Sequence, residues 1–375
     1  MAGQEAKSAG RFLASGADLT RFAEDVFVHA GMRQPDAVLT ARSLVDADAS
    51  GIPTHGVNRL APYVAQLESG QVNPRPDERD VTEGPAFLLV DADRGFGAPV
   101  GIRTVDRIVQ KARTAGVAIA GVTSVAHFGA AGFYTRHAAD RGCLAFAVSS
   151  TSPSVVPFGG RGPRIGNSPI SFASPGSEHP ELVLDMAQSM SSRGRIRLAL
   201  DADESIPEDW AVDEDGHPTR DPAAALAGGV LASGGHKGSA LSLMVEMLAS
   251  GLTGANLTRN IALSGLTGAQ GNAGKADLDV TVGNFYLAID AGVFDDAPEV
   301  RRRATAIADH VRASEPAPDV DGVHAPGDVE EQARERSQRS GIPLREVVLA
   351  DLGKLAERFG VPMPAVTESS GEHEQ

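Results

Sequence analysis

The stretch VAIAGVTSVAHFGAAGFYTRHAADRGCLAFAVSS, residues 117–150, contains the pattern that decides the fold. Its two ends, VAIAGVTSV and LAFAVSS, are nearly continuous apolar runs, which are typical of strands in a sheet covered on both faces. The segment GAAGFYTRHAADRG between them predicts a helix. A strand, a helix and a second strand in succession predict an α/β core.

The same alternation extends to both sides of this stretch. AFLLVDA predicts a strand near residue 86, GIRTVDRIVQKARTAG predicts an amphipathic helix, and DVTVGNFYLAID predicts a later strand. The chain ends read as helices, and VNRLAPYVAQLESG is expected to be a helix broken or kinked at Pro62. KGSALSLMVEMLASGLTG is so apolar that we expect a buried helix there. The predicted segments are a flexible N-terminus at 1–16, helices at 17–85, an α/β domain at 86–297, helices at 298–362 and a disordered tail at 363–375.

Composition and charge exclude several classes of protein. The 375 residues carry a formal net charge of −15, so a nucleic-acid-binding platform is not expected. The only cysteine, Cys143, rules out a disulfide framework within the chain and favours a buried apolar role. The N-terminus lacks the apolar run of a signal peptide, and no run of about 18 apolar residues predicts a membrane span. We therefore expect a cytoplasmic protein.

Some motifs resemble known functional sites but lack the spacing or the residues that those sites require. GFGAPVG, residues 95–101, has the wrong glycine spacing for a dinucleotide-binding turn, and Thr123 and Ser124 stand where an acidic residue is expected. DEDG, residues 213–216, lacks the further ligands of a calcium loop. The histidines show no zinc-type spacing, so no metal site is predicted. No nucleophile elbow or Walker loop is present.

Other stretches point to chemistry. GIPTHGVNRL, residues 51–60, places His55 and Arg59 one turn apart, although the pair could also be a solvated helix start. His127 follows a strand, where ligand-binding groups gather, but a single strand-end histidine is more often structural. Asp185 ends another apolar strand. Lys237 opens a helix whose backbone N–H groups suit a phosphate. Together with the hydroxyl-rich loop SSTSPSVVPFGGRGPRIGNSPISFASP, these features fit an enzyme that binds a phosphorylated cofactor.

The order of these stretches is similar to that in a known family. GIPTHGVNRL, AHFGAAGFY, the hydroxyl-rich loop, LDMAQS, GGHKGSALSLMVE and APGDVEEQ resemble the type-2 malate/L-lactate dehydrogenases over residues 18–345. This resemblance implies an oxidoreductase that uses NAD or NADP. It also implies an α/β cofactor-binding domain unlike the Rossmann fold, a largely helical second domain formed by both chain ends, and a homodimer.

The resemblance also assigns roles to single residues. His127 and His55 match proton-transfer positions, and Arg59, Thr54 and Tyr63 match substrate-contacting positions. Positions that match cofactor contacts are Thr151, Ser152, Asn167, Ser168, Asp185, Met186, Ala187, His236, Lys237, Gly327 and Asp328. The sequence departs from the family at Thr54 (commonly serine), at Arg195 (commonly lysine), at His236 and Ser239 within GGHKGS, and in PGD, which replaces PGE.

The expected reaction is hydride transfer to or from the carbon next to a carboxylate. The substrate would be a small 2-oxo or 2-hydroxy acid of the malate, lactate, sulfolactate or ureidoglycolate type. Histidine suits proton transfer because both of its forms are accessible near neutral pH, so we expect His127 to be the main proton carrier with His55 beside the substrate. Arg59 suits the carboxylate because its planar fork binds two oxygens. The alternatives are reduction of the C=N bond of a cyclic imino acid and a catalytically silent ligand-binding homologue.

Overall fold

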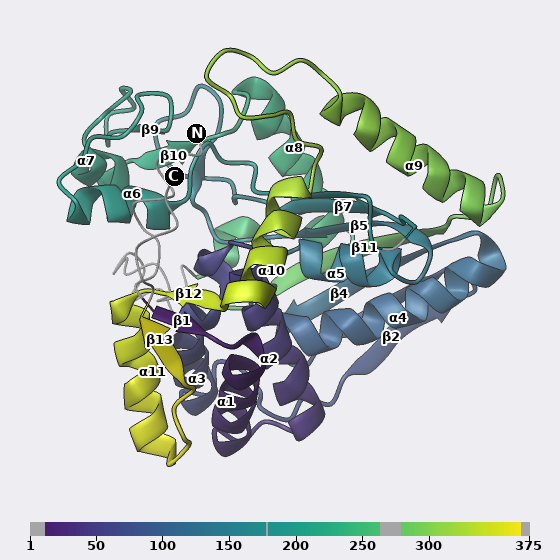
Figure 1. Ribbon diagram of the computed structural model, residues 1–375, viewed down its shortest axis with the longest axis horizontal. Coiled ribbons are helices and arrows are strands. Elements are labelled where there is room, and N and C mark those ends of the chain that lie inside the picture. Colours follow the sequence, from purple (N-terminus) through teal and green to yellow (C-terminus); the bar gives the residue numbers. More distant parts are fainter. Residues whose placement is uncertain (1–11, 178, 263–278, 369–375) are drawn as a thin grey trace. The chain divides into compact units, whose positions relative to one another are not determined.

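The computed structural model describes residues 12–177, 179–262 and 279–368 (Figure 1). The chain forms two compact units. Unit 1 comprises Met1–Pro76 and Asp309–Gln375, and unit 2 comprises Asp77–Ala308. Both ends of the chain therefore belong to the same unit, with unit 2 as one continuous segment between them.

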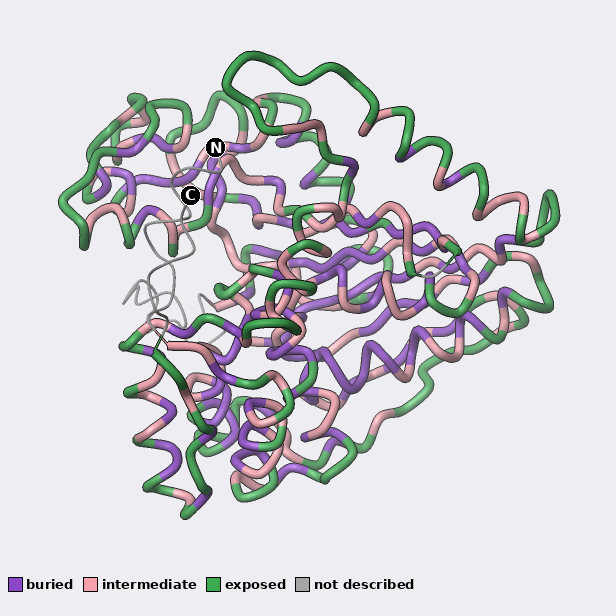
Figure 2. The backbone as a smooth tube through the Cα atoms, viewed as in Figure 1, coloured by how far each residue is buried: buried purple, intermediate pink, exposed green. Residues whose placement is uncertain are grey.

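Unit 2 is built on a mixed seven-stranded sheet in the order β2-β3-β4-β11-β5-β7-β8. Only the β3–β4 pair is parallel in this sheet; the other neighbours are antiparallel. The central strands are largely buried, as their nearly continuous apolar sequences predict (Figure 2). The strands are β2 Arg79–Gly84, β3 Phe87–Asp91, β4 Val117–Val125, β5 Cys143–Ser149, β7 Ile170–Ser174, β8 Leu182–Met186 and β11 Val282–Asp290.

Helices cover both faces of this sheet. Helices α4 (Gly97–Ala115) and α5 (Gly132–Ala139) contact each other and one face, whereas α8 (His236–Glu246) and η5 (Met247–Gly251) contact the other. Gly97 and Gly101 let α4 approach closely, because a Cβ atom at Gly97 would lie 2.6 Å from the His127 oxygen and one at Gly101 would lie 2.4 Å from the Tyr134 ring. The glycines of GFGAPVG thus have a packing role.

The apolar helix that was expected to be buried is only half covered. Val245 and Ala249 pack into the core beneath the sheet, but Met244 and Met247 are 58% and 57% exposed. The sequence prediction was wrong for the outer face, because an all-apolar pattern does not say whether the same chain covers every side.

A smaller sheet in unit 2 has the order β6-β10-β9. Helices α6 (Arg193–Asp201) and α7 (Pro222–Ala227) pack against each other beside this sheet. Ile196 of α6 is fully buried in the core that they share with it. The remaining elements of unit 2 are β6 Val155–Val156, α6 Arg193–Asp201, β9 Ala211–Val212, α7 Pro222–Ala227, β10 Gly229–Leu231 and η6 Thr258–Asn260, and helix α9, Ala297–Arg312, starts in unit 2 and ends in unit 1.

Unit 1 is largely helical, with a three-stranded sheet of order β12-β1-β13. Helix α1 begins directly after Ser15, whose hydroxyl accepts a hydrogen bond from the Asp18 N–H, as an N-cap does. The elements of unit 1 are β1 Phe12–Ala14, α1 Gly16–His29, α2 Gln34–Ala49, η3 Pro53–His55, η4 Val57–Arg59, α3 Leu60–Glu68, α10 Asp328–Ser340, β12 Ile342–Leu344, α11 Glu346–Phe359 and β13 Val366–Glu368.

Two local predictions differ from the structure. Pro62 does not break a helix: α3 begins at Leu60, so the proline lies in the first turn, where its missing N–H costs nothing. Within the predicted disordered tail, residues 366–368 form β13, which pairs with β1, and the residues beyond 368 lie outside the described residues. A Gly- and Asn-rich loop predicted to run to about residue 276 falls largely on 263–278, also outside the described residues.

The expectation for the single cysteine was met. Cys143 is an unpaired, fully buried thiol, and burial raises its pKa to about 11. In the described part of the chain, every helix is too short or too polar to cross a bilayer.

Candidate active site

Thr54 connects the two side chains that the sequence analysis placed one turn apart. Its hydroxyl lies 3.0 Å from Nδ1 of His55, and its carbonyl accepts a 2.7 Å hydrogen bond from Nε of Arg59. These groups lie on the two short 3-10 turns η3 and η4, which are joined by an extended residue, Gly56. Tyr63 follows one turn into α3 and is 3% exposed.

Removal from water sets the charges in this segment. Burial, assisted by the nearby Arg59 charge, lowers the pKa of His55 to about 4. Burial also lowers the pKa of the Arg59 guanidinium and raises that of the Tyr63 hydroxyl. At neutral pH the segment therefore presents a neutral imidazole next to a guanidinium. A guanidinium held by one edge can bind a carboxylate with its other N–H groups, and a neutral imidazole can accept a proton.

His127 lies two residues beyond β4 in unit 2, in a backbone fixed from several sides. The His127 carbonyl accepts a hydrogen bond from the Gly97 N–H at 3.2 Å, and the Tyr134 hydroxyl donates to the Phe128 carbonyl. The Phe128 and Tyr134 rings stack at 4.6 Å. This clamping holds the imidazole on rigid backbone, as a proton carrier requires.

Asp185, at the end of β8, caps the helix that follows His127. Its Oδ2 accepts a 2.6 Å hydrogen bond from the N–H of Gly132, the first residue of α5. A carboxylate at this end is favoured by the helix dipole. The position that resembles a cofactor contact thus has a structural role as well. Met186 is exposed, and Ala187 is half-buried.

The hydroxyl-rich loop and two neighbouring segments come together in unit 2. The Gln188 N–H donates to the Asn167 carbonyl at 2.7 Å, and the Ser168 hydroxyl lies 3.5 Å from the Ser242 carbonyl. A Cβ atom at Gly166 would lie 2.3 Å from the Thr151 hydroxyl oxygen. These contacts join the loop to the end of β8 and to α8, with Ser152 half-buried beside Thr151.

This cluster contains buried polar atoms that lack partners. Thr151 Oγ1, Gln188 Nε2 and Ser242 Oγ are shielded from solvent and have no hydrogen-bond partner within the described residues. Because such groups are costly when unsatisfied, their gathering in one place fits a site that binds a polar ligand. The chemistry of hydroxyls, an amide and backbone N–H groups suits the ribose and phosphates of a dinucleotide.

The start of α8 adds a positive end to this region. Gly235 precedes the helix with a φ of 60°, and within the described residues no side chain caps the first turn. His236 and Lys237 are exposed there, and the His236 ring contacts Phe158 of the hydroxyl-rich loop at 5.8 Å. An uncapped helix N-terminus next to an ammonium is a suitable phosphate site.

Gly327 and Asp328 belong to unit 1. Gly327, with a φ of 101°, precedes α10, and the Asp328 carboxylate accepts hydrogen bonds from Nη2 and Nε of Arg312 at 2.7 and 3.1 Å. Arg312 is the main cause of the lowered pKa of Asp328. In this structure the carboxylate therefore ties α10 to the end of α9.

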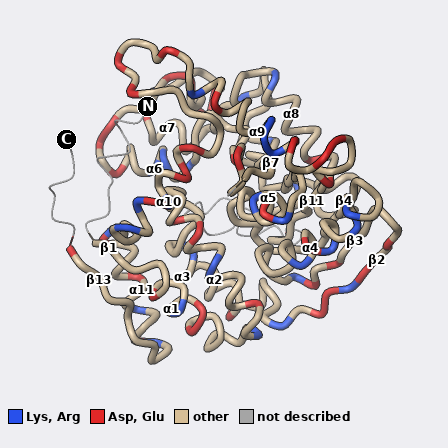
Figure 3. Tube along the Cα trace, turned by 45° about the vertical axis from the view of Figure 1, so that its right-hand side comes forward, with Lys and Arg blue, Asp and Glu red and all other residues tan. Residues whose placement is uncertain are grey.

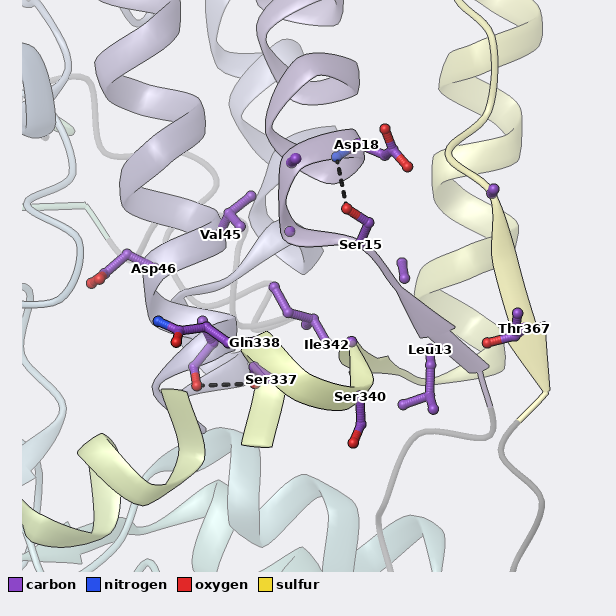
Figure 4. A pocket seen from close by; sticks show the side chains of 16 residues that line it. Leu13, Ser15, Asp18, Val45, Asp46, Ser337, Gln338, Ser340, Ile342 and Thr367 are labelled. Carbon is purple, nitrogen blue, oxygen red and sulfur yellow. Dashed lines mark hydrogen bonds between the residues drawn. The ribbon is translucent and has the colours of Figure 1, made fainter. Parts of the chain in front are cut away.

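A pocket of about 600 Å³ lies elsewhere in unit 1 (Figure 4). Its wall is made by β1, the start of α1 and the ends of α2 and α10, with Leu13, Asp46 and Gln338 among its side chains. None of His55, Arg59 and Tyr63 lines it. This pocket is thus separate from the Thr54–Arg59 segment.

Comparison with known proteins agrees with this chemistry. A family model described as malate/L-lactate dehydrogenase matches residues 15–353. The chain is 35% identical over 323 residues to the (2R)-3-sulfolactate dehydrogenase (NADP(+)) of Chromohalobacter salexigens, covering 86% of this chain and 91% of that protein. It is 34% identical over 341 residues to the Δ1-pyrroline-2-carboxylate/Δ1-piperideine-2-carboxylate reductase of Pseudomonas putida, covering 90% and 95%.

A solved structure extends the likeness to the fold. Sulfolactate dehydrogenase from Methanocaldococcus jannaschii matches with a TM-score of 0.85 and 32% identity, over 93% of this chain and 98% of that one. These findings define the class of protein: an α/β enzyme, an oxidoreductase that uses NAD or NADP. The chain belongs to the malate/L-lactate dehydrogenase family.

The sequence analysis missed two residues of these clusters, Gln188 and Asp48. Gln188 follows the predicted LDMA contacts directly, and a buried amide there is indicated only by the three-dimensional contacts. Asp48 lies on α2 and accepts a hydrogen bond from the Val57 N–H. A second aspartate, Asp46, precedes it by two residues, and the sequence does not show which of the two faces inward.

Proposed function

We propose that this protein interconverts small 2-oxo and 2-hydroxy carboxylic acids with NAD or NADP. The observation that carries the proposal is the double contact of Thr54, which holds the His55 imidazole and the Arg59 guanidinium in one short segment. In this proposal Arg59 binds the substrate carboxylate, and Tyr63 and Thr54 border it. His127 of unit 2 acts in the same reaction as the main proton carrier.

The roles of the side chains follow from their chemistry. Arg59 fixes the carboxylate through two charge-assisted hydrogen bonds, which sets which face of the neighbouring carbon reacts. His127 takes the proton from the substrate hydroxyl during oxidation and returns it during reduction. His55, neutral at physiological pH, accepts a hydrogen bond from the substrate. The nicotinamide, when bound, supplies or receives the hydride at the carbon next to the carboxylate.

Unit 2 is proposed as the coenzyme-binding domain. Thr151, Ser152, Asn167, Ser168 and Gln188 would contact the sugar and pyrophosphate, as would Asp185, Met186 and Ala187 at the end of β8. His236 and Lys237 would hold a phosphate. The mainly antiparallel sheet supports a fold unlike the parallel Rossmann sheet.

A second candidate reaction is reduction of a cyclic C=N bond next to a carboxylate. The Pseudomonas putida relative is named for this activity. The proposed Arg59 contact would serve both reactions equally, because each substrate carries a carboxylate on the reacting carbon. A panel of malate, lactate, sulfolactate, ureidoglycolate and piperideine carboxylate, followed by NAD(P)H absorbance, separates the two.

The test of the proposal is the response of Arg59 variants to substrate charge. Arg59→Ala should lower kcat/KM on a 2-oxo acid about 30- to 1,000-fold, and Arg59→Lys should restore little, because an ammonium does not replace the bidentate contact. Activity on the matching amide should be low in wild type and change little in the variant. Equal loss on acid and amide would show that Arg59 does not bind the carboxylate.

We also propose that the protein is a homodimer joined through the outer face of α8 and η5. This face exposes Leu241, Leu243, Met244, Met247 and Leu252, each between 44% and 58% exposed. Only Glu246 is charged between residues 238 and 256. Two copies of a chain with a net charge of −15 repel each other, so a neutral apolar face is the surface best suited to their contact.

A further inference from the structure

The carboxylate of Asp48 lies beneath the segment that holds His55 and Arg59. Asp48 belongs to the last turn of α2, is 7% exposed, and accepts a 2.7 Å hydrogen bond at Oδ2 from the backbone N–H of Val57. Val57 is the first residue of η4, the turn that ends at Arg59. One side chain of α2 thus holds the backbone between the two proposed site residues.

Gly56 shows how closely this carboxylate fits. A Cβ atom at Gly56 would lie 1.8 Å from Oδ1 and 2.1 Å from Cγ of Asp48. The Gly56 backbone has a φ of −86°, which any residue adopts, so conformational freedom is not the reason for the glycine. The glycine is needed because the carboxylate occupies the space that a side chain would fill.

A buried carboxylate is an expensive way to hold a loop. Its charge is removed from water, and Arg345, just before α11, is the cation that offsets it. An apolar side chain would stabilise the fold equally well, so stability alone does not account for a carboxylate at this position. The Thr54 contacts to His55 and Arg59 lie in the same short segment, so a shift at Gly56 and Val57 would change the separation of the two groups.

We propose that Asp48 is a positioning residue for the reaction, which fixes the backbone of Gly56 and Val57 so that His55 and Arg59 meet one substrate together. This inference rests on the proposed function, in which both side chains act on the same carboxylic acid. Asp48 itself touches neither substrate nor coenzyme in this scheme. Its contribution is the geometry of the two groups that do.

The experiment compares Asp48→Asn, Asp48→Ala and Gly56→Ala in the full-length protein. Asparagine keeps an oxygen acceptor for the Val57 N–H, so Asp48→Asn should hold kcat/KM within about threefold of wild type. Asp48→Ala and Gly56→Ala should each lower kcat/KM for the carboxylic acid about 10- to 100-fold, with the KM for the coenzyme changed less than about twofold.

The matched control is Asp36→Ala, which removes another buried aspartate, 4% exposed, from the first turn of the same helix. Asp36→Ala should lower thermal stability without changing the KM for the carboxylic acid relative to the KM for the coenzyme. The double variant Asp48→Ala/Gly56→Ala should lose less than the product of the single losses, because removing the carboxylate makes room for the new methyl group. Strictly multiplicative losses, or equal behaviour of Asp48→Ala and Asp36→Ala, would overturn the proposal.

Amide hydrogen exchange at Val57 in the ligand-free protein tests the contact without any turnover. Protection should fall at least about tenfold in Asp48→Ala and be retained in Asp48→Asn. Unchanged protection in Asp48→Ala overturns the positioning role even if activity drops. A wild-type protein that reduces none of the 2-oxo acids or imines tested would contradict the proposed function. The exchange pattern at Val57 would still show whether Asp48 holds this backbone.

Discussion

Thr54 determines how His55 and Arg59 can share a ligand. Its hydroxyl contacts Nδ1 of the imidazole, and its carbonyl accepts a hydrogen bond from Nε of the guanidinium. The Nη groups of Arg59 then provide the fork for a carboxylate. A carboxylate bound there would cancel the Arg59 charge that helps to keep His55 neutral, so substrate binding should raise the pKa of His55 above about 4.

The division of labour between the two histidines can be tested by mutation. Because burial holds His55 neutral and His127 stands on clamped backbone, we expect His127→Ala to lower kcat about 10²- to 10⁴-fold with little change in coenzyme affinity. His55→Ala should mainly raise the KM for the acid. Steady-state kinetics in both directions and a coenzyme titration measure these effects. The assignment is reversed if His55→Ala loses the chemical step and His127→Ala remains active.

The raised pKa of the Asp48 carboxyl predicts an unusual dependence of protein stability on pH. Burial raises the pKa of its carboxyl to about 7, while the Val57 N–H and Arg345 oppose that rise. A raised carboxyl pKa means that the folded protein binds the proton more tightly, so this contribution is complete below about pH 4 and is lost as pH rises through about 7. Asp48→Asn, which stays neutral, should gain stability relative to wild type by about 3–5 kcal/mol between pH 4 and 8. Urea unfolding across this range measures the difference, and parallel curves for the two proteins would contradict it.

At the scale of elements, α8 combines two roles. Its first turn contacts the hydroxyl-rich loop through His236 and Ser239, which meet Phe158, and its later turns pack Val245 against the sheet. A close approach is possible because β11 has a glycine there: a Cβ atom at Gly283 would lie 1.8 Å from the Ala249 oxygen. The C-terminal end of α8 and the η5 turn that follows it are thus packed closely on the sheet.

Mutation of Lys237 tests the proposed phosphate site at the start of α8. Lys237→Ala should weaken coenzyme binding about 10-fold and make the remaining affinity less dependent on salt, because one charge-assisted contact is lost. Lys354→Ala, which removes an exposed lysine of α11 paired with Asp351, is the matched control and should leave the titration unchanged. Fluorescence titration of NADH and NADPH at two salt concentrations measures both. Identical binding curves for wild type and Lys237→Ala would mean that the ammonium is only a solvated helix-start residue.

The elements show what could be predicted from the sequence. The strand at 117–125 was predicted at its observed bounds, because a run rich in valine and isoleucine begins directly after Gly116 and ends shortly before Gly129. Pro62 misled because one residue type both starts and breaks helices. The burial of Asp48 could not be predicted from the sequence, because α2 is only weakly amphipathic and buries Asp36 and Asp48 among its alanines. The proposed roles of His55, Arg59 and Lys237 follow from a sequence pattern, while the hydrogen bonds of Thr54 to His55 and Arg59 become visible only in the structure.

For the whole molecule, charge is distributed unevenly over unit 2. Figure 3 shows acidic and basic residues along α4 and the strands beside it, where Arg107 pairs with Asp80 at 2.6 Å and Lys111 with Glu83 at 2.8 Å. The segment from α8 to η5 carries almost none. Salt-bridged surfaces stay soluble and weakly adhesive, whereas a neutral patch of leucine and methionine gains free energy when it is covered.

If a second copy covers that patch, a charge placed in its centre should separate the dimer. Met244 is 58% exposed on α8, so Met244→Lys would bring two like charges together across a two-fold axis and bury them. We expect the dissociation constant to rise at least about 100-fold, with the folded protomer intact by circular dichroism. Phe294→Lys is the control, because Phe294 is 96% exposed in the loop between β11 and α9, outside α8 and η5, and its replacement should leave the dimer unchanged. Sedimentation equilibrium measures the association. A wild-type protein that is monomeric at micromolar concentration, or a Met244→Lys variant that dimerises as tightly as wild type, would place the apolar face outside any interface between copies.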